Sequence, residues 1–167
     1  LKSQIKNLER SVQETESQSE LPENQASNEF KILDEDKIEE LERIEEIGAG
    51  GGGKVTKVAM KEIYALKEMN IKNPNVKNFQ SFISEYELMN MLLHPNVLKT
   101  YGIFMSSEKY PPSILLEYCP MNLEKAIEDK LLSDGDLVKI IYQIAEGMRY
   151  IHFKNVIHRD LKPTNIL

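Results

Sequence analysis

The sequence VIHRDLKPTNIL, residues 156–167, places five side chains of different chemistry within eight positions: His158, Arg159, Asp160, Lys162 and Asn165. Proline disfavours a helical backbone at the residue before it, so Pro163 predicts that this stretch is a loop. A carboxylate, an ammonium group and a carboxamide in one loop can accept a proton, neutralise a phosphate and bind a hard metal ion through oxygen. The order of residues therefore favours a catalytic loop over a polar surface loop.

A second stretch with phosphate-binding chemistry lies upstream, GAGGGGKV at residues 48–55. It contains the pattern GxGxxGxV at Gly48, Gly50, Gly53 and Val55. Glycines let backbone amides approach phosphate oxygens without a Cβ clash. A dinucleotide-binding loop would open a helix at once, but KVTKVAM, which follows, has β-branched residues at strand spacing. The pattern thus favours a strand–turn–strand phosphate loop, with a flexible glycine linker as the alternative.

Two charged side chains are predicted to face each other from apolar surfaces. Strand alternation in EIYALKEM places Lys67 in an apolar row with Ala65. Helical spacing places Glu85 on the same face as Phe82 and Met89. A buried ammonium group needs an anionic partner, so Glu85 is the candidate partner of Lys67. The alternatives are an exposed lysine at a strand edge and a glutamate at the border of the apolar face.

The hydrophobic periodicity predicts an α+β fold with a small antiparallel sheet and one main helix, followed by a mainly helical part. Strand patterns occur at residues 42–48, 54–60, 62–69, 97–104 and 113–119, with a tight turn near Lys61 and Glu62. A helix is predicted through residues 79–93, ending before the turn at 94–96. A long helix is predicted from about Asp136, with Ser133 and Asp134 as candidate caps.

The first residues differ from the rest in charge and pattern. Residues 1–46 hold 6 Lys/Arg against 14 Asp/Glu, whereas the rest holds 15 against 13. With no basic stripe and no long apolar run, the composition argues against nucleic-acid partners and membrane insertion. The spacing of four apolar residues predicts either the end of a coiled coil or a short amphipathic helix, before a polar linker. These residues are Leu1, Ile5, Leu8 and Val12.

Taken in order, the glycine pattern, Lys67, Glu85 and HRDLKPTN resemble a eukaryotic protein kinase domain over roughly residues 41–167. The resemblance implies a bilobal, protein-kinase-like fold. It makes 1–36 an acidic leader, 37–119 the small lobe and hinge, and 120–167 the start of a large lobe that is truncated before the DFG segment. The chain begins with Leu1 instead of Met, so we expect it to be part of a longer protein.

The resemblance also implies ATP and Mg²⁺ as cofactors and gives roles to the nucleotide-binding residues. The three glycines of the pattern would cover the ATP phosphates, and Lys67 would hold the α- and β-phosphates and pair with Glu85. Leu116 would guard the back of the pocket, and the Glu117 and Cys119 backbones would bind adenine. The remaining contacts, with adenine or, for Asn122, with ribose, fall to Ile47, Val55, Ala65, Asn122 and Leu167.

In the C-terminal loop, the resemblance implies that Asp160 accepts the proton of the substrate hydroxyl and that Lys162 neutralises the transferring phosphoryl group. Asn165 would bind magnesium, and Arg159 would contact a regulatory phosphate on the activation loop. His158 is expected to be structural.

The implied function is transfer of the γ-phosphoryl group of ATP to a serine or threonine hydroxyl of a protein substrate, because HRDLKPTN is similar to serine/threonine kinases. The alternative is a catalytically inactive pseudokinase or scaffold, which the glycine-only loop tip and the coiled-coil pattern of the leader favour. That leader would then supply a coiled-coil partner site. One cysteine, Cys119, and no secretion signal predict a cytoplasmic protein, with the nucleus as second compartment.

Overall fold

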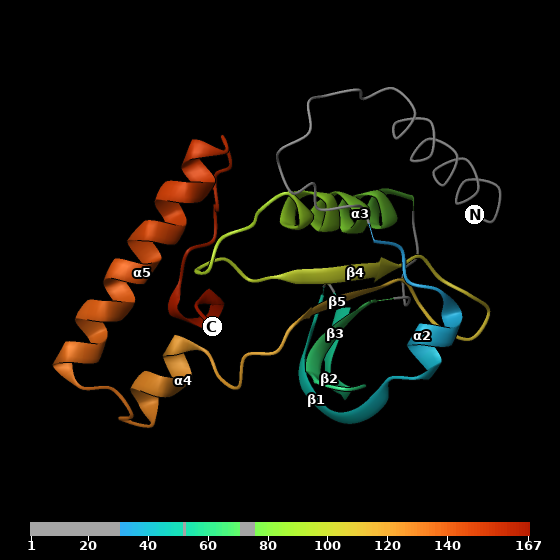
Figure 1. The fold of residues 1–167 in the computed structure, drawn as a ribbon, viewed down its shortest axis with the longest axis horizontal. Coiled ribbons are helices and arrows are strands. Elements are labelled where there is room, and N and C mark those ends of the chain that lie inside the picture. The colour runs from blue at the N-terminus through green and yellow to red at the C-terminus, as the bar shows by residue number, and fades with distance from the viewer. Residues whose placement is uncertain (1–30, 52, 71–75) are drawn as a thin grey trace.

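The computed structural model describes residues 31–51, 53–70 and 76–167, and the coiled-coil pattern at residues 1–12 lies outside them. Its centre is a five-stranded antiparallel sheet, followed by a helical part at the C-terminal end (Figure 1). This arrangement confirms the predicted α+β fold. Across the described residues, no helix combines the length and the apolar character needed to cross a membrane.

The strands lie in the order β1-β2-β3-β5-β4, which makes β1 and β4 the edges of the sheet. The tight turn predicted between the second and third strands is present, with the Met60 amide donating to the Glu62 carbonyl at 3.1 Å. The fourth strand is shorter than predicted, because residues 97–99 connect to it without joining it. The strands are β1 Glu42–Gly50, β2 Gly53–Ala59, β3 Ile63–Met69, β4 Thr100–Phe104 and β5 Ser113–Glu117.

Helix α3, Val76–Asn90, covers one face of the sheet (Figure 1). Its buried side chains form one core cluster with side chains of β3, β4 and β5. The helix ends earlier than its apolar pattern suggested, since Leu92 and Leu93 lie beyond Asn90. Leu92 remains buried while Leu93 is exposed, so the end of the pattern belongs to the connection toward β4. The helical residues of the cluster are Phe79, Phe82, Ile83 and Tyr86.

The opposite face of the sheet is covered by a segment that crosses the predicted boundary at residue 36, since Leu33 lies before it and Ile38 after it. Helix α2, Glu35–Glu39, begins at Asp34, whose side chain accepts from the Lys37 amide. Leu33 and Ile38 are buried in a second core cluster with residues of β2, β3, β4 and β5. We expected a polar leader to residue 36. Within residues 31–36, Leu33 is buried, whereas residues 31, 32, 34 and 36 are exposed.

The C-terminal part contains α4 Leu123–Glu128, α5 Asp134–Phe153 and a short 3₁₀ helix, η1 Pro163–Asn165. Helix α5 starts two residues before the predicted position. Ser133 is its N-cap, and Asp136 completes a capping box at the third helical residue instead of opening the helix.

Helix α5 packs closely against the connection between α3 and β4. A Cβ added to Gly147 would lie 2.7 Å from the carbonyl oxygen of Asn96, so only glycine fits this approach. The Tyr150 hydroxyl accepts from the Leu93 amide at 2.9 Å, and its ring stacks on His94 with centroids 4.9 Å apart. These contacts set the position of the helical part relative to the sheet.

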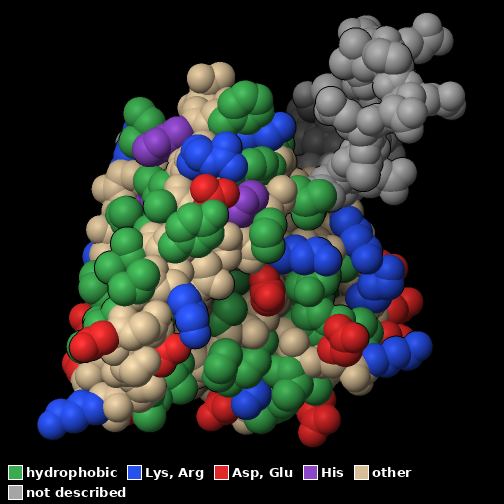
Figure 2. All heavy atoms as spheres, turned by 60° about the vertical axis from the view of Figure 1, so that its left-hand side comes forward, with side chains coloured by type: hydrophobic (Ala, Val, Ile, Leu, Met, Phe, Trp, Pro, Cys, Tyr) green, Lys and Arg blue, Asp and Glu red, His purple; other side chains and the backbone are tan. Residues whose placement is uncertain are grey.

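Much of α5 away from this contact is exposed. Of the predicted apolar stripe, Ile151 is buried, whereas Ile141 is 65% exposed. Hydrophobic side chains lie among charged ones on this side of the molecule (Figure 2). The exposed hydrophobic residues of α5 are Val138, Ile141, Tyr142 and Phe153.

Candidate active site

The predicted pair of Lys67 and Glu85 is formed between β3 and α3. Lys67 lies opposite Val55 of β2 and Ile114 of β5, in the middle of the sheet. Its Nζ atom contacts the Glu85 Oε1 atom, and the two side chains are 24% and 42% exposed. Exposure to solvent weakens such a pair as a source of stability. The geometric effect of the Lys67–Glu85 pair is to fix the lysine amine at the face of the sheet that α3 covers.

The strand register gathers part of the predicted adenine site around this lysine. Ala65 lies two residues before Lys67 and directly opposite Leu116 of β5, and both are buried. Val55 adjoins Lys67 from β2. By contrast, Ile47 falls at an irregularity of the β1–β2 pairing and is 43% exposed. Leu167, in the C-terminal part, is 60% exposed.

The three glycines of GxGxxGxV have different surroundings. Gly53 has φ +141°, and a Cβ there would lie 2.0 Å from the carbonyl oxygen of Glu68, so the fold itself requires glycine. At Gly48 and Gly50, nothing lies within 4 Å of an added Cβ. The hairpin therefore presents open backbone at these two positions, which is the surface that a bound phosphate needs.

The C-terminal loop brings three of its predicted residues into direct contact. The Lys162 Nζ atom lies 3.0 Å from Asp160 Oδ2, and the Asn165 Nδ2 atom donates to the same oxygen and to the Asp160 carbonyl, each at 2.8 Å. The hydrogen bond from Lys162, and then that from Asn165, lowers the pKa of Asp160 below its ordinary value. Asp160 is thus held as an exposed carboxylate with a fixed orientation.

The backbone around Asp160 is also constrained. His158 Nδ1 accepts from the Asp160 amide at 3.3 Å, a structural role in line with the sequence analysis. Arg159 is exposed and has φ 65°, a left-handed conformation that is uncommon outside glycine. The loop is less irregular than predicted, because residues 163–165 form η1. It is tied to α4 by the Leu123 amide, which donates to the Ile166 carbonyl at 2.8 Å.

The last residue of β5 and the segment after it contain the residues predicted to bind adenine and ribose. The Glu117 amide donates to the Lys99 carbonyl at 2.9 Å, so a hydrogen bond between adenine and this backbone would use the Glu117 carbonyl. Burial, and then the nearby Glu117 carboxylate, raises the pKa of the Cys119 thiol. Asn122, predicted to contact ribose, accepts from the Lys125 amide at 2.9 Å as the N-cap of α4. Capping was the signal that sequence reasoning missed, since asparagine is a preferred N-cap residue.

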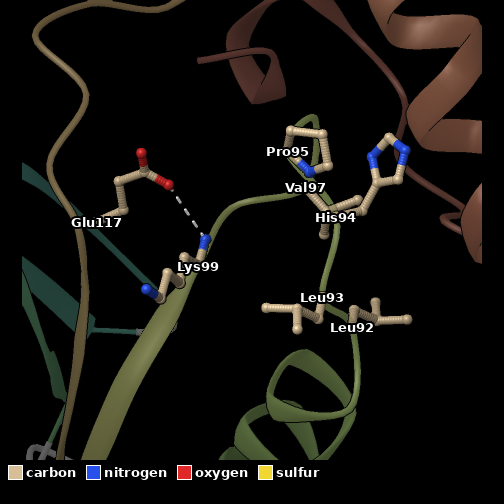
Figure 3. Close-up of a pocket in the computed structure, with 7 residues that line it drawn as sticks. All are labelled: Leu92, Leu93, His94, Pro95, Val97, Lys99 and Glu117. Carbon is tan, nitrogen blue, oxygen red and sulfur yellow. Dashed lines mark hydrogen bonds between the residues drawn. The ribbon is translucent and has the colours of Figure 1, made fainter. Parts of the chain in front are cut away.

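A pocket of about 330 Å³ lies between the end of β5 and the connection from α3 to β4. Figure 3 shows two of its lining residues in contact, with the Lys99 amide donating to the Glu117 carboxylate at 3.4 Å. Of the predicted site residues, only Glu117 lines it, so this pocket is separate from the Lys67–Glu85 pair. Its other lining residues are Leu92, Leu93, His94, Pro95, Val97 and Lys99.

The donor set in the C-terminal loop fits a magnesium ion that is shared with a phosphate. Among the residues that the structure describes, no group of three or more His, Cys, Asp and Glu side chains could hold a metal ion. Magnesium on a nucleotide needs only one or two protein oxygens, since phosphates and water complete its shell. The Asn165 amide nitrogen faces Asp160, which leaves its Oδ1 atom as a ligand oxygen.

Comparison with known proteins agrees with this geometry. A family model described as "Protein kinase domain" matches residues 41–167. The chain is 36% identical over 156 residues to an Aurora kinase of Saccharomyces cerevisiae, covering 87% of this chain and 40% of that protein. It is 33% identical over 146 residues to mitogen-activated protein kinase kinase 8 of Arabidopsis thaliana, covering 85% and 42%.

A third relative is calcium-dependent protein kinase 5 of Plasmodium berghei, 31% identical over 141 residues, which are 81% of this chain and 25% of that protein. The chain thus spans between a quarter and about two fifths of the length of these relatives. The family match covers more than half of the chain and includes both groups of candidate residues. The chain belongs to the protein kinase domain family.

Proposed function

We propose that the protein is an ATP-dependent protein serine/threonine kinase, to which this chain contributes the nucleotide-binding sheet and the catalytic loop. The observation that carries the proposal is the contact of Asp160 with Lys162 and Asn165. A scaffold would not need an oriented carboxylate, an ammonium group and a carboxamide gathered at one exposed point. The Lys67–Glu85 pair supplies a second cation, placed on the sheet.

The proposed division of labour follows from the charges. ATP with Mg²⁺ would supply the γ-phosphoryl group. The Lys67 amine neutralises phosphate oxygens and is kept in position by Glu85, while open backbone at Gly48 and Gly50 covers them. Asp160 orients the substrate hydroxyl and accepts its proton, and its lowered pKa keeps it ionised for this role. Lys162 neutralises charge that develops on the transferring group, and Asn165 offers its oxygen to the metal.

Lys162 also supports the choice of substrate. It lies beside the proposed base and near the place where a substrate hydroxyl must come, and the sequence HRDLKPTN is similar to that of serine/threonine kinases. Serine and threonine are thus the proposed acceptors. The three relatives named above are kinases by name, which supports transfer of phosphate in general.

The proposal is tested by incubating the full-length protein with Mg²⁺, γ-labelled ATP and a mixture of peptides that contain serine, threonine or tyrosine. We expect label on serine or threonine, and we expect Asp160→Asn to lower kcat by about 100-fold or more, as for loss of a general base.

The matched control is Asp129→Asn. Asp129 is an exposed aspartate of the same lobe that also pairs with a lysine, Lys125, at 2.8 Å, but it lies outside the loop. It should retain wild-type activity. Undiminished phosphotransfer by Asp160→Asn would refute the proposed function, and label on tyrosine alone would refute the proposed specificity.

A further inference from the structure

Residues 31–34, which we call the strap, run along the free edge of the sheet. In Figure 1 the strap is the blue trace that leads into α2 near the tip of β4. Ile32 forms a parallel bridge with Ile103 of the edge strand β4. The Leu33 amide donates to the Ile103 carbonyl at 2.7 Å, and the Ile103 amide donates to the Lys31 carbonyl at 2.9 Å. The strap therefore pairs backbone groups that an edge strand otherwise leaves open.

The sequence of β4 is adapted to the strap. A Cβ added to Gly102 would lie 2.9 Å from the Lys31 carbonyl oxygen and 2.9 Å from the Leu33 side chain. Any larger residue would push the strap away from the strand. Gly102 is itself buried, and its backbone torsions require no glycine, so this close approach is the reason that the structure offers for glycine at position 102.

The strap also bonds to α3, through the side chain of Tyr86. Tyr86 of α3 is fully buried. Its hydroxyl accepts a hydrogen bond from the Lys31 amide at 3.1 Å and donates one to the Lys31 carbonyl at 3.4 Å. The remaining buried side chains of α3, Phe79, Phe82 and Ile83, make apolar contacts, which tolerate sliding and rotation. A hydrogen bond is directional and so fixes a position along the helix.

Tyr86 directly follows Glu85, the partner of Lys67. We propose that the strap fixes α3 through the Tyr86 hydroxyl, so that Glu85 stays opposite Lys67 and Tyr86 acts as a positioning residue for the phosphate-binding lysine. The catalytic part of this inference rests on the proposed function. Because Tyr86 bonds to the strap, displacement of the strap from β4 would release α3 and lower nucleotide affinity.

The first test is amide hydrogen exchange in α3 of the full-length protein without nucleotide. Tyr86→Phe keeps the ring and removes only the hydroxyl. It should raise exchange in α3 about five-fold, the factor in an equilibrium constant that one typical hydrogen bond contributes. Gly102→Ala should raise it at least as much, since it displaces the strap without altering α3. The double variant should add little to Gly102→Ala, because both changes break the same connection.

The second test is steady-state kinetics of the same variants. The KM for ATP should rise by roughly the factor seen in exchange, whereas the KM for the peptide substrate should stay constant. A merely structural role of Tyr86 would reduce the amount of folded enzyme and would leave the KM for ATP unchanged. The matched control is Tyr64→Phe, which removes a tyrosine hydroxyl that donates to Glu62 and not to the strap, and should change neither quantity.

Unchanged α3 exchange in Tyr86→Phe, or faster exchange with an unchanged KM for ATP, would overturn the inference. A wild-type protein that transfers no phosphate would refute the proposed function instead. In that case the exchange experiment still decides whether the strap holds α3, and strictly additive effects of the two substitutions would show that it does not act as one connection.

Discussion

At the scale of single residues, the chemistry of the site depends on short contacts around two side chains. Glu85 holds the Lys67 amine, and Lys162 with Asn165 holds the Asp160 carboxylate. The sequence was sufficient to predict these groups because their residue types are unusual where they stand. It did not predict the capping role of Asn122, since an asparagine that caps a helix and one that binds a ligand look the same in a sequence.

The lowered pKa of Asp160 leads to a prediction at this scale. The pKa of Asp160 lies below its ordinary value chiefly because Lys162 donates to the carboxylate. Removing that cation in Lys162→Met should raise the pKa of Asp160 toward its ordinary value, which a carbon-detected NMR titration of the carboxyl group would measure. In Asp129→Asn, the pKa of Asp160 should not change. A pKa of Asp160 that is the same with and without Lys162 would contradict the contact.

The same shift fixes the sign of a pH effect. A carboxyl group whose pKa is lower in the folded state stabilises that state at pH values above its ordinary pKa. This contribution is lost as the pH falls through the lowered folded-state value. Asp160 is therefore expected to stay charged at neutral pH and to play no part in any activity change between about pH 6 and 8.

At the scale of elements, the strands and helices followed from periodicity, and their ends did not. All five strands and both long helices were predicted from the spacing of their apolar residues, including β1, whose residues are all exposed in the structure. Helix α3 ends at Asn90, before its apolar pattern does, and α5 begins at Asp134 because Ser133 caps it. Ends are decided by caps and tertiary contacts, which a hydrophobic pattern does not contain.

The β1–β2 hairpin allows a prediction with an internal control. Gly53→Ala should destabilise the fold by about 2 kcal/mol or more, because its backbone conformation suits only glycine and the new methyl group would meet the Glu68 carbonyl. Gly50→Ala, with nothing near its Cβ, should change stability by no more than about 1 kcal/mol. Chemical denaturation measures both. Equal losses would show that the two glycines do not differ in their surroundings.

At the scale of the whole molecule, the sequence predicted a sheet-based lobe and a helical lobe. It did not predict how the chain before β1 packs against the sheet. Residues 31–36 are polar in character, apart from Ile32 and Leu33, and so resembled a linker. Their role comes from long-range contacts with Ile103 and Tyr86. The contact of Gly147 with Asn96 could not be predicted either, because a single glycine in a helix pattern does not indicate which residue packs against it.

The central claim is that the Lys67–Glu85 pair in one lobe and the Asp160 loop in the other form a single phosphoryl-transfer site. The most direct measurement is kcat for peptide phosphorylation by wild-type protein, Lys67→Met, Asp160→Asn and the double variant. When two groups act as one catalytic unit, the effects of substituting them on kcat are strongly non-additive. The account predicts that each single substitution lowers kcat by about 100-fold or more and that the double variant is scarcely worse. Independent, multiplying losses, or activity that survives either substitution, would contradict it.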